Sequence, residues 1–385
     1  MVRKELRTLA LLGALGLPPT LMAAPQTEWT RTFFVANNAI DSSTCGTSNA
    51  PCRSISRAID NARNGDRILV RPGRYGDLNG DGDFNDPGEE AAEVGFGCRC
   101  MILVDKRLII ESTEGAVATV LDASGAQLDV VNITASHVVF GGNGRGFTLT
   151  GARKTGDDDG FGMEVQATRG VRVIDNVAIG NRSFGFVVRG SLHTARNNIS
   201  SGNGHGFAFS ATEEGHTITD NVATTNGNDE EFGHGFVISG NSQSSMSNRS
   251  IGNKGVGFFL STTNGSGFVF KENDAIGNRG VGVWVQQGPQ LALHRNNIFG
   301  NLGVAIGGFF PPLPNCGLAN NSGSTINATR NFWGAPTGPG PDPADEAGPG
   351  SICDQNGLTI VTPFETRPST LKGESRLLGD DDNGE

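Results

Sequence analysis

Carboxylates, amides and glycines alternate in the stretch DLNGDGDFNDPGEE, residues 77–90. Asp77, Asn79 and Asp81, followed by a glycine, match the first half of an EF-hand-type loop, in which oxygen ligands at alternate positions precede a tight bend. The twelfth position is also a glycine, and acidic residues follow it one and two places later. Because Ca²⁺ accepts varied oxygen geometry, we expect a modified, structural calcium loop, with a metal-free acidic insertion as the alternative. Its candidate ligands are Asp77, Asn79, Asp81, Asp83 and Glu89.

Two further acidic clusters and two histidines have the residue types of acid–base catalysis. The clusters GDDDGFG (156–162) and NDEEFGHG (228–235) each precede a strand-like segment, and the motif GHGF surrounds both His205 and His234. Paired carboxylates catalyse glycoside hydrolysis, and a histidine beside a carboxylate can transfer protons. Solvated loops without chemistry are the alternative interpretation. The candidate catalytic residues are Asp157, Asp158, Asp229, Glu231, His205 and His234.

A short repeat must position these residues. Six pairs of asparagines, five positions apart within each pair, recur every 22 to 27 residues, at Asn176/Asn181, Asn198/Asn203, Asn221/Asn226, Asn248/Asn253, Asn273/Asn278 and Asn296/Asn301. Each pair is followed by glycine and by two apolar residues with one residue between them, such as Phe207 and Phe209. Alternation with period two indicates strands, and strands this short must stack on neighbouring repeats.

The repeat favours a parallel β-helix. A leucine-rich repeat has a similar period, but it needs leucines at fixed offsets and a helical half, and this sequence has neither. We therefore expect like residues to stack about 4.8 Å apart, with the asparagines forming ladders that bond turn backbone. His193 and His216 share the parity of the inward apolar residues, so a hydrogen-bonded core ladder is expected for them.

The residues between the inward ones should form an outward stripe along one sheet. Apolar residues flanked by polar ones on an exposed face suggest a contact surface. The repeats contain one Trp and no Tyr, so the stripe is poor in the aromatic residues that sugar grooves usually offer, and either a sugar or a protein partner fits. The candidate substrate-binding residues are Glu164, Arg189, Phe259 and Trp284.

The ends of the chain differ from the repeats. Residues 1–23 combine a basic start, a short apolar run and small residues, which is typical of a signal peptide. Residues 30–366 are expected to form one β-helix domain, with an N-terminal cap over 30–75 containing a short helix and with the calcium-loop-like insertion at 77–90; residues 367–385 are expected to be an acidic disordered tail. No later segment is apolar enough to span a membrane, so a secreted or periplasmic location follows.

The net charge and the cysteines restrict the partners and the cellular compartment expected for this chain. The net charge of −10 argues against nucleic acid or anionic lipid as a partner. Six cysteines in an exported chain suggest disulfides. We expect the pairs Cys45–Cys52 and Cys316–Cys353, while a bond from Cys45 or Cys52 to Cys98 or Cys100 stays open.

The N-terminal segment FFVANNAIDSST…APCRSISRAIDNARNGDRILVRPGRY resembles the cap of bacterial right-handed parallel β-helix proteins of the pectate-lyase-like superfamily, and NFWGAPTGPG is similar to the end of the same group. The resemblance extends from Phe33 to about Phe364 and implies an all-β, right-handed parallel β-helix with an N-terminal capping helix. The superfamily includes polysaccharide lyases, glycoside hydrolases, epimerases and proteins without a known reaction, so fold alone does not fix activity. We expect a protein that binds an extracellular polysaccharide and that, if it is an enzyme, cleaves it as a lyase or a glycoside hydrolase. A non-catalytic secreted scaffold or adhesin with a cell-surface partner is the alternative.

Overall fold

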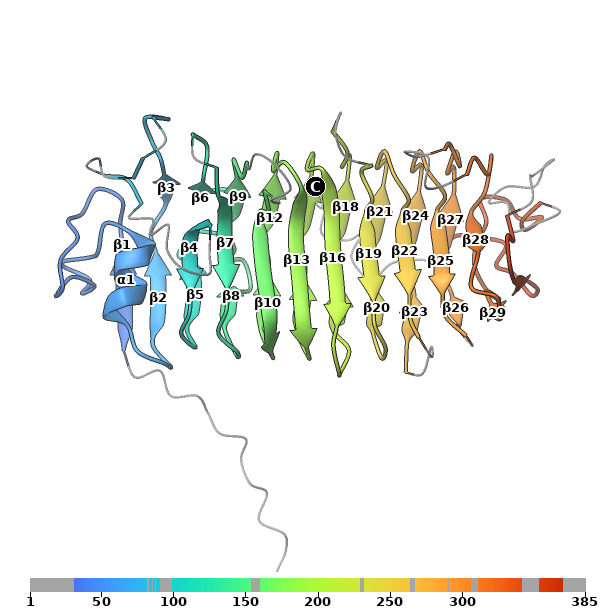
Figure 1. Ribbon diagram of the computed structural model, residues 1–385, viewed down its shortest axis with the longest axis horizontal. Coiled ribbons are helices and arrows are strands. Elements are labelled where there is room, and N and C mark those ends of the chain that lie inside the picture. The colour runs from blue at the N-terminus through green and yellow to red at the C-terminus, as the bar shows by residue number, and fades with distance from the viewer. Residues whose placement is uncertain are drawn as a thin grey trace, which may run out of the picture.

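Three long parallel sheets run side by side along the molecule and wind the chain into stacked coils (Figure 1). The computed structural model describes residues 31–369 except 82, 85, 87, 91–98, 126, 154–159, 229–231, 264–266, 290, 306–310 and 341–352. Within one coil the chain passes from the third sheet to the first, then to the second, and returns to the third in the next coil. This confirms the predicted parallel β-helix.

The first sheet has ten strands. They are, in spatial order, β1 (Thr32–Val35), β2 (Arg67–Val70), β5 (Ile109–Ser112), β8 (Val139–Gly141), β11 (Arg172–Ile174), β14 (Thr194–Arg196), β17 (Thr217–Thr219), β20 (Ser244–Met246), β23 (Val269–Lys271) and β26 (Leu293–His294). The second sheet has nine strands, β3 (Gly73–Gly76), β6 (Thr119–Asp122), β9 (Thr148–Thr150), β12 (Val177–Ile179), β15 (Ile199–Ser201), β18 (Val222–Thr224), β21 (Arg249–Ile251), β24 (Asp274–Ile276) and β27 (Asn297–Phe299).

The third sheet, which faces the viewer in Figure 1, also has nine strands. They are β4 (Cys100–Val104), β7 (Asp129–Ile133), β10 (Met163–Arg169), β13 (Phe184–Ser191), β16 (His205–Ala211), β19 (Phe236–Ser239), β22 (Phe258–Ser261), β25 (Val283–Gln287) and β28 (Leu318–Asn320). A small sheet of β29 (Thr325–Asn327) and β30 (Leu358–Ile360) follows near the C-terminal end.

Identical positions stack from coil to coil in the interior. Phe207 pairs in register with Phe236, which pairs with Phe258, and all three side chains are buried. Their rings lie nearly parallel, with centroids 4.8 Å apart at each step. One strand of a coil thus supplies the packing partner of the next, and the core is a continuous column.

Both asparagine ladders form as predicted. Asn198 donates its backbone N–H to Asn221 Oδ1 over 3.0 Å, and its side-chain amide donates to the Val173 carbonyl over 2.9 Å. The second ladder repeats this pattern, with Asn203 bonding to Asn226 Oδ1 and to the Ala178 carbonyl. Each buried amide therefore satisfies backbone groups of the preceding coil that would otherwise be buried without partners.

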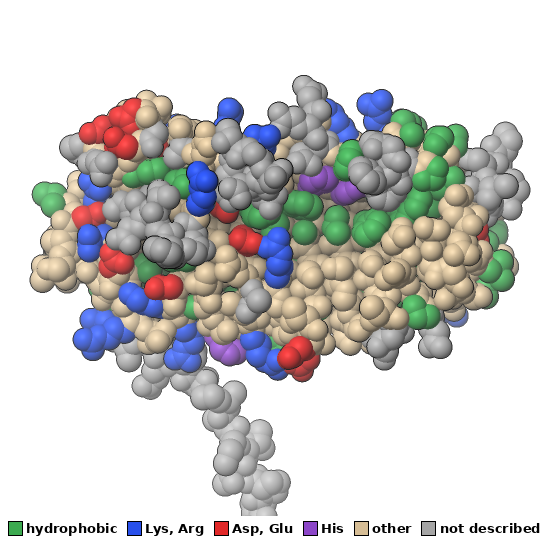
Figure 2. All heavy atoms as spheres, viewed as in Figure 1, with side chains coloured by type: hydrophobic (Ala, Val, Ile, Leu, Met, Phe, Trp, Pro, Cys, Tyr) green, Lys and Arg blue, Asp and Glu red, His purple; other side chains and the backbone are tan. Residues whose placement is uncertain are grey.

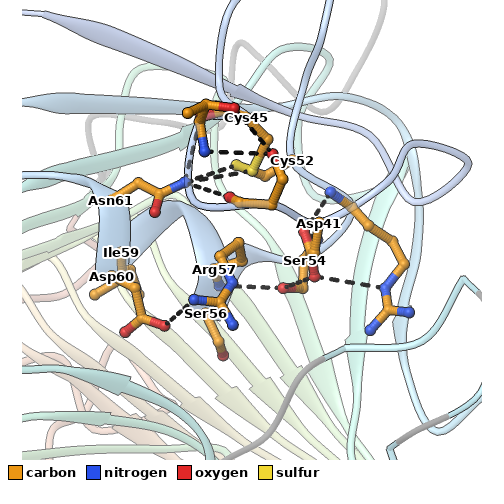
Figure 3. Close-up of polar contacts among 12 residues, drawn as sticks. Asp41, Cys45, Cys52, Ser54, Ser56, Arg57, Ile59, Asp60 and Asn61 are labelled. Atoms are coloured by element: carbon orange, nitrogen blue, oxygen red, sulfur yellow. Dashed lines mark hydrogen bonds and ion pairs between the residues drawn. A yellow bond between two sulfur atoms is a disulfide. The ribbon is translucent and has the colours of Figure 1, made fainter.

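The N-terminal cap holds α1 (Ile55–Asn61), whose buried side chains Ile55, Ala58 and Ile59 lie on one face as the spacing predicts. Ser54 caps it by accepting the Arg57 N–H, and the Ser54 hydroxyl donates to Asp41 (Figure 3). No helix in the described part of the chain is long and apolar enough to span a membrane.

The disulfide Cys45–Cys52 is present beside α1, which confirms that pairing and excludes a bond from either cysteine to Cys98 or Cys100 (Figure 3). The Asn61 amide at the end of α1 donates to the Cys45 carbonyl. The disulfide loop is therefore fixed to the capping helix.

The Phe column predicts that Phe236→Asp is severely destabilising, because it removes a fully buried ring and buries an unpaired charge. We expect a loss on the order of 4 kcal/mol in the free energy of unfolding, measured by guanidinium titration. The matched control is Val237→Asp, at the next residue but on the half-exposed outer face. Equal losses in both variants would contradict the register described here.

Candidate functional site

The outer face of the third sheet carries a shallow groove across β13, β16 and β19. Its floor includes Val187, Ala208 and Val237, which occupy successive rungs of the sheet. A hollow of about 150 Å³ is lined by Phe161, Phe184, Val187, Arg189, Ala208, Phe209, Ser210, Val237 and Ser239. Figure 2 shows this strip of hydrophobic side chains along the middle of the face, with histidine side chains beside it. The predicted outward stripe is thus the floor of a groove with a polar row, Ser210 and Ser239, along one side.

An ion pair closes one end of the groove. Glu164 and Arg189, both predicted to bind substrate, contact each other directly, and Asn132 donates its amide to Glu164 Oε2 over 3.0 Å. The Arg189 guanidinium also lies over the Phe161 ring, 5.9 Å from its centroid. Two donors already hold the Glu164 carboxylate, and its charge is paired with that of Arg189. This end of the groove can still form hydrogen bonds with a ligand.

The other end of the groove is covered by the protein itself. Phe259 is half-buried and stays at the edge of the open part, whereas the Trp284 side chain is only 3% exposed. Trp284 packs in a separate apolar cluster with Val256, Val281, Leu313, Cys316, Ala319 and Cys353. The expectation that Trp284 is exposed along the stripe is wrong, because the segment before β28 and the chain around Cys353 cover that coil.

Cys316 and Cys353, which we expect to pair, are both fully buried in this same cluster. The structure has no disulfide bond between them. Cys100 does form a disulfide. The expected Cys316–Cys353 disulfide is therefore wrong for this structure, which buries both side chains in one apolar cluster without joining them.

Four rings form an aromatic row along the groove, in the order Phe161, Phe184, His205 and His234. The centroids of Phe184 and His205 are 4.5 Å apart, and those of His205 and His234 are 5.2 Å apart. Strand parity alone would turn His205 inward beside Phe207, but the alternation is interrupted at Gly206, where a Cβ would point inward to within 2.9 Å of the buried Ala223 Cβ. A Cβ on Gly206 would lie 2.1 Å from the Gly235 carbonyl oxygen, so the GHGF motif requires glycine there.

Backbone hydrogen bonds fix the tautomer of this histidine pair. His205 Nδ1 accepts the His234 N–H over 3.0 Å, and His234 Nδ1 accepts the Val256 N–H over 3.1 Å. Each neutral imidazole therefore carries its proton on Nε2. Burial, together with the charge of His205, lowers the pKa of His234 to about 3. A weakly basic imidazole whose Nδ1 is already occupied is poorly suited to the catalytic role predicted for His234.

The four candidate catalytic carboxylates, Asp157, Asp158, Asp229 and Glu231, lie outside the described residues. Described residues that flank them border the groove. Phe161 lines the hollow, and the Phe232 ring lies 6.2 Å from His234. The described residues next to both acidic segments thus lie near the same aromatic row, and whether the carboxylates form a pair stays a prediction.

A second histidine pair lies in the interior, as predicted. His193 Nδ1 accepts the Val171 N–H and His216 Nδ1 accepts the His193 N–H, at 3.0 and 3.2 Å. The third member of this ladder, Gln243, was not predicted from the sequence. Its Oε1 accepts the His216 N–H, and its amide donates to the Ser239 carbonyl. A neutral imidazole protonated on Nε2 offers the same acceptor and donor as a glutamine amide, which explains why both residue types occupy one ladder. Burial lowers the pKa of His216 to about 4.

The predicted calcium loop uses its carboxylates on its own backbone. Asp77 Oδ1 accepts the Gly80 N–H over 2.6 Å, and Glu89 Oε1 accepts the Leu78 N–H over 2.9 Å. The Asn79 amide donates to Asp81, and the Asp83 N–H donates to Asp81 as well. Among the described residues, the one group of three or more His, Cys, Asp or Glu side chains with ligand atoms within 4.8 Å of one another is Asp41 with the disulfide Cys45 and Cys52. The five predicted ligands therefore do not converge in this arrangement, and calcium stays a prediction.

The neighbouring Glu90 has a different role. Its carboxylate accepts the N–H groups of Ile55 and Ser56 at the N-terminus of α1, over 3.0 and 2.7 Å. Burial raises the pKa of Glu90 to about 7. The insertion at 77–90 is thereby anchored to the capping helix.

Stacked coils of three parallel sheets, two asparagine ladders and a capping helix define a right-handed parallel β-helix. A family model described as "Periplasmic copper-binding protein (NosD)" matches residues 121–306, from the end of β6 to beyond β27, which is just under half of the chain. No curated protein matches. The chain therefore has the right-handed parallel β-helix fold that its cap and end motifs predict.

Solved structures with a similar arrangement include carbohydrate-active proteins. A pectate lyase, Pel9A, is 17% identical with a TM-score of 0.46, over 88% of this chain and 79% of that one. A rhamnogalacturonan lyase is 12% identical with a TM-score of 0.42, over 87% of each chain. The GH136 lacto-N-biosidase from Eubacterium ramulus is 10% identical with a TM-score of 0.41, over 88% of this chain and 68% of that one. At these identities the likeness concerns the fold alone.

The inner histidine ladder predicts acid-sensitive stability. An unfolded His has a pKa of 6.5 and folded His216 one of about 4, so the stability from neutral His216 is fully present above pH 6.5 and is lost as pH falls through 4. His216→Gln keeps the acceptor and donor but does not titrate. We expect the wild type to lose on the order of 2 kcal/mol more than this variant between pH 7 and pH 4, by guanidinium unfolding. His137→Asn, at an exposed histidine, is the control and should leave the pH dependence unchanged; equal slopes for all three proteins would rule the ladder out as the cause.

If the loop at 77–90 binds calcium, the ion should raise the melting temperature by mass action on the folded state. Asp81→Asn combined with Asp83→Asn should abolish that shift and the uptake of one ion in calorimetric titration, because both side chains are exposed and their loss spares the fold in chelator. Glu213→Gln, an exposed acid elsewhere, is the control. Equal ion uptake by wild type and double variant would exclude this loop.

Proposed function

We propose that this protein is an exported β-helix protein that binds an extracellular polysaccharide in the groove of the third sheet. The observation that carries the proposal is the open hollow over β13, β16 and β19, with an apolar floor and a parallel row of serines. A sugar ring presents apolar C–H faces and hydroxyl groups at its edge, so a floor such as Val237 beside hydroxyls such as Ser210 and Ser239 suits it. The stacked strands hold this surface rigid, and successive coils repeat it along the axis of the helix.

The negative charge of the protein limits which polysaccharides the groove can bind. The chain has a net charge of −10, and its acidic clusters at 157–159 and 229–231 precede the described residues Phe161 and Phe232 near the groove. A bare polyanion would be repelled by such a surface, so a neutral or calcium-bridged polysaccharide is the expected ligand. Arg189 and Glu164 at the closed end can bind hydroxyl groups, since each keeps hydrogen-bonding capacity beyond their mutual contact.

Cleavage would require the acidic segments to supply the chemistry. Glycoside hydrolysis needs two carboxyl groups at about 5 to 9.5 Å from each other. Glu164 is engaged by Arg189 and Asn132, and His234 is held as a neutral partner of backbone, so the described residues do not supply such a pair. We propose Asp157, Asp158, Asp229 and Glu231 as the groups that would act, in a hydrolase or a lyase.

The alternative is a non-catalytic scaffold or adhesin whose groove is covered by a protein partner. One observation favours it. The same outer face is already covered by polypeptide two coils beyond β19, where Leu313 and Trp284 belong to the separate apolar cluster. A partner chain could continue this cover along the groove.

Copper, named in the description of the matching family, does not fit the described residues. Metal binding through the Nε2 atoms of His205 and His234 would move their protons to Nδ1, where backbone N–H groups already donate. The one compact group of potential ligands contains two sulfurs joined in a disulfide. We therefore derive no copper chemistry for this chain.

The location we propose is the periplasm or the extracellular space. The basic, apolar and small-residue pattern of residues 1–23 supports export. The matching family is described as periplasmic. The confirmed disulfide Cys45–Cys52 agrees with an oxidising compartment.

Ala208→Arg should block the groove, since this half-buried residue lies at its centre and a long charged side chain there would fill the hollow. We expect at least tenfold weaker binding to whichever member of a panel of plant, algal and bacterial glycans the wild type binds in calcium, with an unchanged melting temperature. Thr217→Arg, an exposed position on the first sheet, is the control. Cleavage abolished by Glu231→Gln in a folded protein would establish an enzyme, whereas no binding to any glycan would favour the scaffold.

A further inference from the structure

A second hollow lies far from the groove, at the corner between the first and second sheets near the C-terminal end. It has a volume of about 480 Å³ and is lined by Lys271, His294, Arg295, Asn327, Thr329 and Arg330. Lys271 and His294 end the adjacent strands β23 and β26, and Asn327 ends β29. The lining thus comes from three successive levels of the helix and belongs neither to the groove nor to the calcium-loop-like insertion.

This hollow is basic in an acidic protein. Lys271, Arg295 and Arg330 bring three positive charges to it, while the whole chain has a net charge of −10. The ion pair that involves the lining is Arg295 with Glu272, at 3.9 Å, and the Arg295 side chain is 59% exposed. One carboxylate near three cations leaves the hollow with an excess of positive charge, which attracts anions.

The fold does not require arginine at these positions. Arg295 and Arg330 each precede a ladder asparagine and have φ of 58° and 59°. The equivalent turn position in other coils is occupied by Asp175, Asn197, Asp220, Ser247 and Glu272, all with φ between 56° and 60°. The left-handed conformation favours Asn and Asp, so two successive arginines there are not explained by backbone geometry.

The remaining lining groups suit an oxyanion. Each guanidinium can donate two parallel hydrogen bonds to phosphate, sulfate or carboxylate, and Lys271 adds a compact positive charge. His294 Nδ1 donates to the Thr329 carbonyl over 2.9 Å, which fixes the ring against the wall of the hollow. The volume exceeds what an inorganic ion needs and lies in the range of small-ligand pockets.

We propose that this hollow, the basic corner pocket formed by Lys271, Arg295 and Arg330, binds the phosphate group of a phosphorylated ligand. The positive excess matches a dianionic group, and the size leaves room for the molecule that carries it. A soluble phosphorylated sugar and a phospholipid headgroup present the same chemistry to these residues, so the source of the phosphate is a question for experiment. The proposal does not depend on polysaccharide binding in the groove.

Calorimetric titration of the full chain with inorganic phosphate and with glucose 6-phosphate tests the proposal, with glucose as the neutral control. Sedimentation with phosphatidylglycerol vesicles, against phosphatidylcholine vesicles, tests the lipid source. The variant is Arg295→Asn combined with Arg330→Asn, because asparagine occupies the same turn position at residue 197. Arg172→Asn, at an exposed arginine of the first sheet outside the pocket, is the matched control.

We expect wild type and Arg172→Asn to bind a phosphate-bearing probe equally, and the double variant to bind it at least tenfold more weakly at an unchanged melting temperature. Binding should weaken as sodium chloride is raised, because the contact is electrostatic. A preference for glucose 6-phosphate over vesicles would assign a soluble ligand, and the reverse a lipid. Absence of binding to every phosphate probe, or equal binding by the double variant, would overturn the proposal.

Discussion

The hydrogen bond from a backbone N–H in one coil to an asparagine Oδ1 in the next is the interaction on which this structure depends. A solenoid turns its chain sharply at every coil, and each turn removes backbone groups from the sheets that would otherwise pair them. The Asn198 and Asn203 side chains each accept a backbone N–H and donate to a carbonyl of the preceding coil, so one buried side chain satisfies two backbone groups. Replacing such a partner leaves buried backbone groups unsatisfied at about 1–3 kcal/mol each, so the ladders set where every turn must fall.

Because the ladders fix the turns, they also fix which side chains face outward, and function is confined to those positions. The groove arises at outward positions such as Ala208, which alternates with the inward Phe207 and Phe209 on β16 and lines the hollow. An outward side chain can contact a ligand only where no other segment of the chain covers it. Trp284 cannot, because Leu313 and its neighbours cover its coil.

Much of the fold could be predicted from the sequence, because its determinants are local and repeat. The Asn pairs, the alternating Phe residues and the helix over Ile55–Asn61 are each visible within one short window. The candidate site was less predictable. The burial of Trp284 depends on residues that follow it by about 30 and 70 positions, and no periodic signal marks such a cover. The partner of the inner histidines, Gln243, was missed because a shared donor and acceptor pattern, and not a shared residue type, defines that ladder.

The calcium-like loop shows a different limit of sequence reasoning. Alternating oxygens predict ligands, but the same carboxylates can bond their own backbone, as Asp77 and Glu89 do. Composition does not distinguish these two uses. Geometry does, since a carboxylate turned to N–H groups around it and one turned to a common centre differ only in rotamer and loop path.

The turn position before each ladder asparagine has a consequence for how such a protein can change. The backbone there asks only for a positive φ, and the chain meets this demand with acidic, neutral and basic residues in turn, from Asp175 to Arg330. The side chains at this corner form a row, with about one side chain per 4.8 Å of helix length. Each of them can be substituted without disturbing the buried core of stacked side chains. In a β-helix of this kind, the residues that set the fold and the residues that set the surface charge at this corner can therefore change independently. New binding specificities can arise there while the core stays the same.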